Sequence, residues 1–434
     1  MTTTITWAEL SEQEQATTLL RPALSNSEQL SQQVSNIIEQ VAQDGDQALL
    51  ALTEKFDGIA LTQLRVTEKQ VELAIESLSD KRREAIAQAY EQIKRFHQAQ
   101  VFNEVNVETA PGVVCTLKSE PIQSVGLYIP AGTAPLPSTV LMLGVPAQIS
   151  GCERRVLVSP PDKNGNIAPE VLACAQMCGI EEIYAIGGAQ AVAALALGTS
   201  SIKPVNKVFG PGNSFVTEAK KQLSQQVPGF AIDMPAGPSE VLVIADEDAN
   251  PEFVAADLLS QAEHGTDSQV VLVATDQNLI TRVQDAIDKQ CQSLSRRTIT
   301  EKALAHARYI LVNDLAKAVQ VSNQYAPEHL IVQTQAPREL IGKLRNAGSI
   351  FLGKYTPESA GDYASGTNHV LPTYGYSKVI SSLSLADFSR RYTVQEITKQ
   401  GLANIAPSII ELTDAEGLDA HQKAVTIRLS EEQA

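Results

Sequence analysis

Residues 124–132 read SVGLYIPAG. The apolar run 125–129 stops at a proline and a glycine, as a buried strand does where it meets a turn. Seven further short apolar runs, separated by segments of helical character, cover residues 156–158, 183–186, 208–209, 241–244, 270–273, 309–312 and 349–352. Strands that alternate with helices form largely parallel sheets, so the fold class is α/β. Eight strands are too many for one small sheet, and we therefore predict two α/β units.

The segments on either side of this region have a different pattern. The first 120 residues read as helical, with apolar residues at helical spacing from Leu30 to Val41 and a break at Gly45. Thr67 and Gln70 resemble a capping box, and a long polar helix is predicted over 80–98. After Leu383 the sequence again reads as charged helix, without further strands. Tails of this kind often pack on a partner subunit.

Composition and charge exclude several classes of partner. The formal net charge is -16, and so much negative charge would repel nucleic acid or an anionic membrane. The longest uncharged stretch, 124–152, is broken by four prolines, which argues against a membrane helix. The start of the sequence has no secretory signal pattern. The five cysteines have no paired spacing, and we read Cys174 and Cys178 as buried thiols on one helix face. We therefore expect a cytoplasmic protein.

The six histidines are scarce enough for their neighbours to be informative. His97 and His306 lie in polar, helix-like sequence, and we expect both at the surface. His264 follows Gln261 by three residues, so on a helix both side chains share one face and can reach one metal ion. The alternative is a histidine stabilised by the dipole at the end of its helix.

Two further segments combine carboxylates with an imidazole. Glu328 and His329 are adjacent at a predicted helix-to-strand junction, so they point to opposite sides and could serve two protons; the alternative is a solvated loop pair. The glycine-rich segment 357–373 holds Asp362, a plausible metal ligand, with Glu358 and His369, which could hold a polar substrate; an ordinary loop is the alternative. Glu416 and His421 read, by themselves, as part of a surface helix.

The candidate cofactor site has no G-x-G-x-x-G fingerprint. Three glycine- or proline-rich turns instead follow apolar runs and precede predicted helices, at 128–133, 187–190 and 210–213. Turns at the carboxyl ends of parallel strands bind ligands in open α/β sheets, and helix N-termini favour phosphate. The alternative is that these are packing turns without a ligand.

Taken together, the motifs resemble the histidinol dehydrogenase family. The resemblance rests on seven segments in order along nearly the whole chain: GLYIPAG (126–132), GGAQA (187–191), GPGN (210–213), DMPAGPSE (233–240), SQAEHG (260–265), APEH (326–329) and SAGDYASGTNHVLPT (359–373). Each segment is weakly specific alone, but seven in sequence make a chance match very unlikely.

The resemblance implies an NAD-dependent oxidation of L-histidinol through L-histidinal to L-histidine, with one Zn²⁺ per subunit. It implies the catalytic pair Glu328 and His329. The implied zinc ligands are Gln261, His264, Asp362 and, from the other subunit of a homodimer, His421. The implied substrate contacts are Ser239, Gln261, His264, His329, Glu358, Asp362, His369, Glu416 and His421. The implied NAD contacts are Tyr128, Gln190 and Asn213.

The resemblance also implies two incomplete Rossmann-like domains with helical tails that swap across the dimer. We expect an N-terminal helical tail (1–25), a first domain with the metal and catalytic residues (26–121 plus 239–381), an NAD-binding domain (122–238) and a C-terminal tail (382–434). Two other functions remain open. One is a dehydrogenase of another small polar alcohol in the same superfamily, and the other is a metal-binding structural or regulatory protein. The substrate-contact positions argue against the first, and Glu328 with His329 argues against the second.

Overall fold

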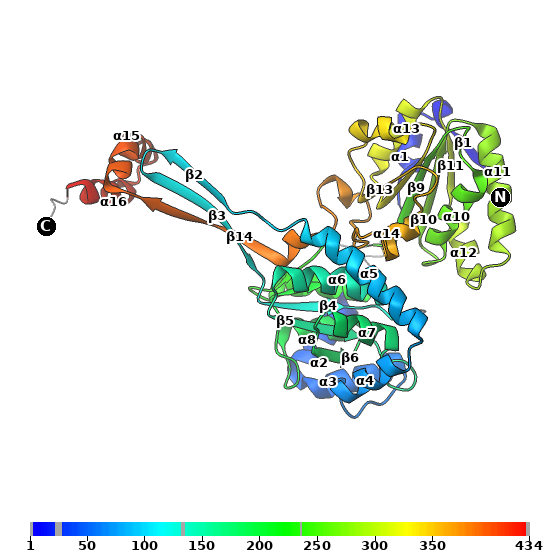
Figure 1. Cartoon of the computed structure of the whole chain (residues 1–434), viewed down its shortest axis with the longest axis horizontal. Coiled ribbons are helices and arrows are strands. Elements are labelled where there is room, and N and C mark those ends of the chain that lie inside the picture. Colours follow the sequence, from blue (N-terminus) through cyan, green and yellow to red (C-terminus); the bar gives the residue numbers. More distant parts are fainter. Residues whose placement is uncertain (1–2, 22–27, 132–134, 235–236, 431–434) are drawn as a thin grey trace.

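The computed structural model describes residues 3–21, 28–131, 135–234 and 237–430. Gly132 and Thr133 of the first predicted turn, and Pro235 with Ala236 of the 233–240 motif, lie outside these residues. The described chain forms two α/β units and a long arm (Figure 1). All eight predicted strands are confirmed, and they divide between two parallel sheets as expected.

The larger unit contains a six-stranded parallel sheet of order β1-β11-β10-β9-β12-β13. The strands are β1 (Thr4–Thr6), β9 (Glu240–Ala245), β10 (Gln269–Ala274), β11 (Arg308–Leu311), β12 (His329–Gln333) and β13 (Ser349–Leu352). Along β9, Val241 and Val243 join one hydrophobic cluster while Leu242 and Ile244 join the other, so both faces of the sheet are covered. The covering helices are α10 (Pro251–Ala262), α11 (Gln277–Cys291), α12 (Arg297–Leu304) and α13 (Leu315–Tyr325). The short helix α1 (Glu12–Thr18) follows β1 and buries no residue. Burial on both faces explains the continuous apolar runs of the central strands.

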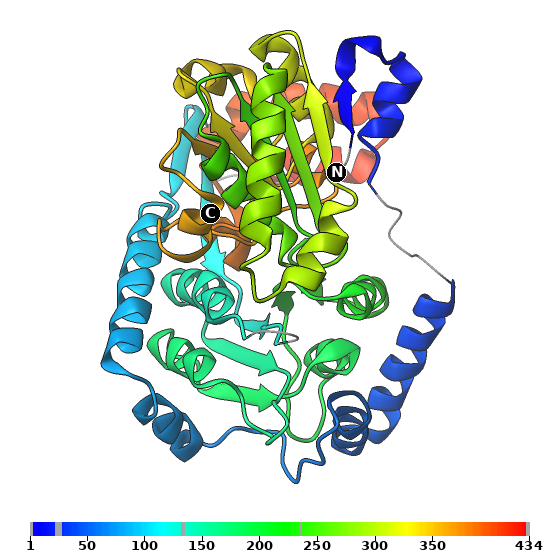
Figure 2. The same ribbon diagram turned by 90° about the vertical axis from the view of Figure 1, so that its right-hand side faces the viewer.

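The smaller unit contains a five-stranded parallel sheet of order β6-β5-β4-β7-β8. The strands are β4 (Ser124–Tyr128), β5 (Arg154–Ser159), β6 (Glu182–Ala185), β7 (Lys207–Phe209) and β8 (Ala231–Ile232). The helices that follow these strands are α6 (Pro137–Ser150), α7 (Pro169–Met177), α8 (Gly188–Leu197) and α9 (Ser214–Gln226). α6 and α7 share one hydrophobic cluster with the sheet, and α8 and α9 share the other. Figure 2 shows the two units one above the other.

The N-terminal segments pack differently from the expected domain grouping. α2 (Glu28–Asp44) and α3 (Asp46–Asp57) bury their apolar faces against α8, and α4 (Glu68–Glu76) and α5 (Asp80–Gln98) pack on α6 and α7. These helices therefore cover the smaller sheet, whereas the sequence predicted that they belong with the 239–381 unit. The expected helical tail is also partly wrong, because β1 extends the six-stranded sheet and Trp7 enters its core. Apolar helix faces pack wherever a complementary face is available, and sequence alone does not say which sheet offers it.

Three strands and two helices form the arm, which extends away from both units (Figure 1). β2 (Val105–Ala110), β3 (Val113–Pro121) and β14 (Ser389–Ile397) pair antiparallel, and α15 (Lys399–Glu416) and α16 (Asp419–Ser430) lie at the far end. The expectation of helix before residue 121 is confirmed for α2 to α5 but wrong for residues 105–121, and the expectation of no strand after Leu383 is wrong. β14 is mostly exposed, and a strand that buries neither face has no apolar signal.

Three local predictions are confirmed. α5 spans 80–98 as expected, and the Thr67–Gln70 capping box begins α4. Cys174 and Cys178 are buried, as expected. Within the described residues, no helix combines the length and apolar character that a bilayer crossing requires.

Candidate active site

The candidate site lies at the amino-terminal edge of the six-stranded sheet. His329 is the first residue of β12, Ser239 immediately precedes β9, and His264 follows the C-terminal end of α10. A short helix, α14 (Glu358–Tyr363), places Glu358 and Asp362 one turn apart on one face. Open α/β sheets more often bind ligands at the opposite edge, so strand topology would not have located this site.

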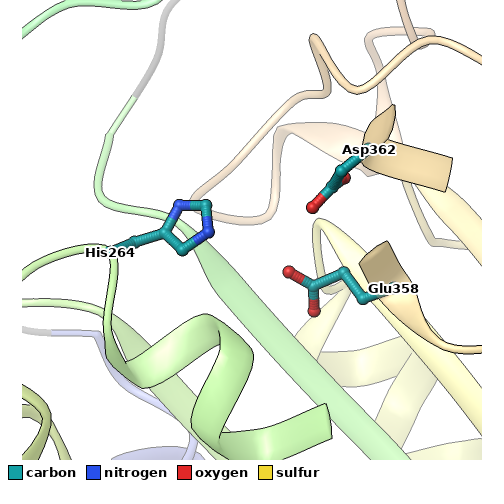
Figure 3. A group of neighbouring side chains, drawn as sticks. All are labelled: His264, Glu358 and Asp362. Carbon is teal, nitrogen blue, oxygen red and sulfur yellow. The ribbon is translucent and has the colours of Figure 1, made fainter. Parts of the chain in front are cut away.

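Three of these side chains form a group that could hold a metal ion. His264, Glu358 and Asp362 each offer one ligand atom, and these atoms lie within 4.8 Å of one another. Figure 3 shows the imidazole of His264 facing both carboxylates. Gln261 precedes His264 by three residues, at the buried C-terminal end of α10. The sequence predicted the Gln261–His264 pair, and the fold brings α14 to it.

Several buried polar atoms around this group have no hydrogen-bond partner within the described protein. In the described residues, the buried atoms without a hydrogen bond include both amide atoms of Gln261, both carboxylate oxygens of Glu358, Nε2 of His329 and Nε2 of His369. Buried polar groups in native proteins are nearly always hydrogen-bonded, so a cluster of unpaired ones indicates a missing ligand. Imidazole, carboxylate and amide oxygens are donors that suit zinc. The residues therefore fit the metal that the resemblance implies.

Glu328 and His329 are both buried and are held by one peptide of the neighbouring strand. The backbone N–H of Glu240 donates to Oε2 of Glu328 at 2.8 Å, and Nδ1 of His329 lies 3.1 Å from the carbonyl oxygen of Glu240. If Nδ1 donates to that carbonyl, Nε2 is left free to accept a proton. Nε2 lies 3.6 Å from Oδ1 of Asp362, beside the candidate metal group.

Burial and mutual charge alter the acidity of these groups. Burial raises the pKa of Glu328 to about 8 and that of Glu358 to about 8, while the charge of His329 opposes both shifts. Burial alone would lower the pKa of His329, but Glu358, Glu328 and Asp362 raise it well above its usual range. Burial lowers the pKa of His369, opposed by the charge of Asp362. Shifted pKa values with specific charged partners are typical of catalytic sites.

A further buried carboxyl, Asp257, lies one helical turn before Gln261. Nε2 of Gln333 donates to its Oδ2 at 2.6 Å, and burial raises the pKa of Asp257 to about 7. A carboxyl group whose pKa is raised by folding makes the folded protein less stable as the pH rises from about 3.8, the unfolded value, to about 7. Above pH 7 the protein keeps this lower stability.

We expect Asp257→Asn to be more stable than the parent protein above pH 7, by about 1–3 kcal/mol, and to have a flatter dependence of Tm on pH. Asparagine keeps the acceptor for Gln333 and removes the charge. The measurement is Tm at pH 5 and pH 8, with the exposed Asp288→Asn on α11 as control. Equal pH dependence in Asp257→Asn and the parent would contradict this account.

The three predicted cofactor residues lie at the carboxyl edge of the five-stranded sheet. Tyr128 ends β4, Gln190 lies in the first turn of α8, and Asn213 caps α9 by accepting from two backbone N–H groups. The hydroxyl oxygen of Tyr128 accepts from the N–H of Gly188 at 3.0 Å, so two of the predicted turns meet. Burial raises the pKa of Tyr128 to about 12 and keeps the phenol neutral.

The third turn is held by a buried ion pair. Lys220 donates to Oδ1 of Asp233 and to the carbonyl oxygen of Gly210, and the N–H of Gly210 donates to Oδ2 of Asp233. A Cβ on Gly210 would lie 2.1 Å from the carbonyl oxygen of Tyr128, so only glycine fits there. The strand ends and helix starts are thus fixed close together, as the prediction of a ligand-binding edge requires.

Two predicted site residues stay apart from the others within one chain. Glu416 ends α15 and His421 lies on α16, at the end of the arm away from α14 (Figure 1). Both are exposed. Their assignment to a shared site therefore depends on a second subunit and stays a prediction.

Sequence reasoning also missed or misread residues next to the site. His97 was expected at the surface, but it is buried on α5 and its Nε2 lies 3.4 Å from Nδ2 of Asn368, the neighbour of His369. A polar helix sequence gave no hint of this contact, because the partner lies 271 residues away. Glu240, whose peptide holds Glu328 and His329, and Arg21, which binds the side chain of Glu240, were also missed.

Comparisons with known proteins agree with the motif analysis. The histidinol dehydrogenase family model matches residues 20–429. Histidinol dehydrogenase of Colwellia psychrerythraea is 68% identical over 427 residues, with 98% of each chain covered. The enzyme of Aliivibrio fischeri is 57% identical over 426 residues, covering 98% of this chain and 96% of the relative. The crystal structure of histidinol dehydrogenase from Elizabethkingia anophelis has a TM-score of 0.94 and 46% identity, covering 97% of this chain and 96% of that one.

Proposed function

This chain belongs to the histidinol dehydrogenase family, and from that premise we propose that it oxidises L-histidinol through L-histidinal to L-histidine with NAD and zinc. The observation that carries the proposal is the group of unpaired buried polar atoms around Glu328, His329 and the His264–Glu358–Asp362 group. The site offers donors for a metal and titratable groups for two proton transfers, and several of its buried polar atoms have no hydrogen bond within the described protein. The negative net charge and the free cysteines suit a cytoplasmic biosynthetic enzyme.

The zinc ligands in this proposal are Gln261, His264 and Asp362, completed by His421 of a second subunit. Zinc has no redox role, so when bound it would orient and polarise the polar groups of the substrate. Glu358, Ser239 and His369 are then available to bind the amine and imidazole of histidinol. The unpaired oxygens of Glu358 and the unpaired Nε2 of His369 support this assignment, because both atoms need a partner that the chain does not supply.

In the proposed reaction the proton transfers fall to His329 and Glu328. Alcohol oxidation needs a base for the hydroxyl proton, and the proposed base is Nε2 of His329 in its neutral form. Burial alone would lower the pKa of His329, but neighbouring carboxylates raise it, so this step should gain rate as the pH rises to where the imidazolium loses its proton. Oxidation of the aldehyde needs a water molecule to be deprotonated as it adds to the carbonyl. Glu328 is the proposed base for that water, while His329, after passing its first proton to solvent, accepts the second one. The bonds from Glu240 hold both side chains in place during the two steps.

NAD is proposed to bind at the carboxyl edge of the smaller sheet, where it would accept hydride in each oxidation. Tyr128, Gln190 and Asn213 are the proposed contacts. The proposal is supported by the meeting of the turns at 128 and 188 and by the position of the N-terminal ends of α8 and α9 at this edge, because helix N-termini favour phosphate.

The test of the proposed function is the NADH formed per histidinol consumed by the purified protein, with and without a chelator. We expect two NADH per histidinol, loss of activity on chelation and recovery with added zinc. No turnover of histidinol by zinc-replete protein would favour oxidation of another small polar alcohol. One NADH per histidinol would mean that only the alcohol step occurs, and it would remove the role given to Glu328 as the base for water in the aldehyde step.

We further propose a homodimer whose arms exchange, so that His421 and Glu416 complete the partner's site. The proposal is supported by the extended arm and by exposed apolar residues along it, namely Val105, Val107, Val394, Ile397, Leu412, Leu418 and Ile427. A monomer would leave these side chains in water, whereas a second copy would bury them.

Subunit mixing tests the shared site. His421→Asn and His329→Asn should each be inactive, but a mixed dimer holds one site with an intact catalytic pair and an intact partner His421. Random reassociation should therefore restore about a quarter of the activity, because half of the dimers are mixed and each has one working site. A mixture of His264→Asn with His329→Asn should restore none, since one subunit supplies both residues. If mixing His421→Asn with His329→Asn restored no activity, the proposed exchange of arms between subunits would be contradicted.

A further inference from the structure

We propose that Arg21 is a positioning residue for the Glu328–His329 pair and acts through a buried ion pair with Glu240. This inference rests on the function proposed above and adds a residue that touches neither the proposed ligands nor the reacting atoms. Arg21 follows α1, in a segment expected only to be a tail, and 219 residues separate it from Glu240. Its side chain nevertheless connects three parts of the chain that meet behind the catalytic pair.

Glu240 is the residue through which Arg21 acts. Its peptide N–H holds the carboxylate of Glu328, and its carbonyl oxygen faces Nδ1 of His329. The orientation of both proposed bases therefore depends on where this one residue lies at the start of β9. The side chain of Glu240 is fully buried, so its carboxylate needs partners inside the protein.

Arg21 supplies those partners with a forked contact. Nε and Nη2 donate to the two carboxylate oxygens of Glu240 at 2.5 and 2.7 Å, and the N–H of Tyr374 donates to Oε1 at 2.9 Å. A two-point guanidinium–carboxylate pair fixes orientation as well as distance. The guanidinium also lies 3.9 Å from the ring centroid of Tyr325, which restricts it further.

The same guanidinium holds the turn that leads into the catalytic pair. Nη2 donates to the carbonyl oxygens of Tyr325 and Ala326 at 2.9 and 3.2 Å. Ala326 has φ of 55°, the left-handed conformation that a residue with a Cβ rarely adopts. Such a turn persists only where its surroundings hold it. Arg21 thus fixes the backbone two residues before Glu328 and, through Glu240, the hydrogen bonds of Glu328 and His329.

The chain offers a matched control in the other unit. Arg154 also makes a two-point pair with a glutamate, Glu182, and also donates to two carbonyl oxygens, those of Lys203 and Pro204. Arg154 begins β5 of the smaller sheet, and none of its contacts involves the Glu328–His329 segment. Arg154→Met therefore removes an equivalent set of bonds without altering the position of the catalytic pair.

The experiment compares Arg21→Met, Arg21→Lys and Arg154→Met in the full-length, zinc-loaded protein. We expect Arg21→Met to lower kcat for histidinol by about 10–100-fold, as supporting residues around reactive groups do, while KM and zinc content change little. Arg21→Lys should recover part of kcat because it keeps the charge but not the fork. Arg154→Met should keep kcat. Hydrogen exchange of the 325–329 backbone should be faster in Arg21→Met alone.

Each outcome decides the proposal. The proposal would be overturned if folded Arg21→Met kept both the kcat and the 325–329 hydrogen-exchange rate of the parent protein. It would also be overturned if Arg154→Met changed both quantities as much as Arg21→Met does. If Arg21→Met does not fold, Arg21→Lys provides the same comparison. If the parent protein does not oxidise histidinol, the proposed function fails. The rate of hydrogen exchange in the 325–329 backbone then still decides whether Arg21 positions the pair.

Discussion

Glu328→Gln is expected to stop the reaction at the aldehyde and to release one NADH per histidinol where the parent protein releases two. Glutamine keeps the size of the side chain and an oxygen that can accept from the N–H of Glu240, so the fold around His329 should persist. It cannot take a proton from water. The rate of histidinal oxidation should therefore fall by about 10²–10⁴-fold, the usual contribution of a general base. The rate of the alcohol step, in which we assign the base to His329, should fall far less.

The measurement supplies histidinol and histidinal separately and follows NADH at zinc saturation. Burial raises the pKa of Glu328 to about 8, so the histidinal step of the parent protein should gain rate as the pH rises through the range where this carboxyl loses its proton. Glu339→Gln, an exposed glutamate of the same unit, is the control. If Glu328→Gln oxidised histidinal as fast as the parent protein, the assignment of separate roles to Glu328 and His329 would be wrong.

His264→Asn is expected to weaken zinc binding by at least about 100-fold and to remove both oxidations with it, since loss of supporting contacts alone already costs 10–100-fold in affinity. His264 supplies one of the three ligand atoms that lie within 4.8 Å of one another. Zinc content after gel filtration and competition with a chelator measure the affinity. Excess zinc should restore part of the activity if the ligand set is otherwise intact.

His306→Asn is a closely matched control for this prediction. Both histidines are exposed, both lie two residues beyond the end of a helix, and the backbone N–H of each donates to the carbonyl three residues earlier. A histidine that only interacts with a helix dipole would behave alike at the two positions. If His264→Asn binds zinc as tightly as the parent protein, His264 is not a zinc ligand and interacts only with the helix dipole. Glu358→Gln should retain zinc if Glu358 contacts the substrate, and lose zinc if it is a ligand.

The α/β architecture followed from the sequence because the strands concerned are buried on both faces. Burial of both faces requires uninterrupted apolar runs, and such runs are visible without any knowledge of their neighbours. The same reasoning failed for the three-stranded arm, in which β2 and β14 are mostly exposed and β3 between them is only partly buried. It also failed for His97, whose polar helix has one buried stripe that contacts Asn368.

The candidate site divides in the same way. The Gln261–His264 pair and the Glu328–His329 step are local, so spacing on a helix or strand indicated which groups act together. Whether α14 reaches the end of α10, and which peptide holds Glu328, depends on how the sheet is assembled.

The sequence by itself determined the type of most buried elements, the motifs that place the chain beside a known family, and the candidate reactive side chains. Only the tertiary structure decided which sheet the N-terminal helices cover, that three strands form an arm, and that Arg21 lies behind Glu328. The physical reason is the range of the interactions. Periodicity and capping act within a few residues, whereas the approach of Arg21 to Glu240 depends on the packing of the whole unit, which no local pattern encodes.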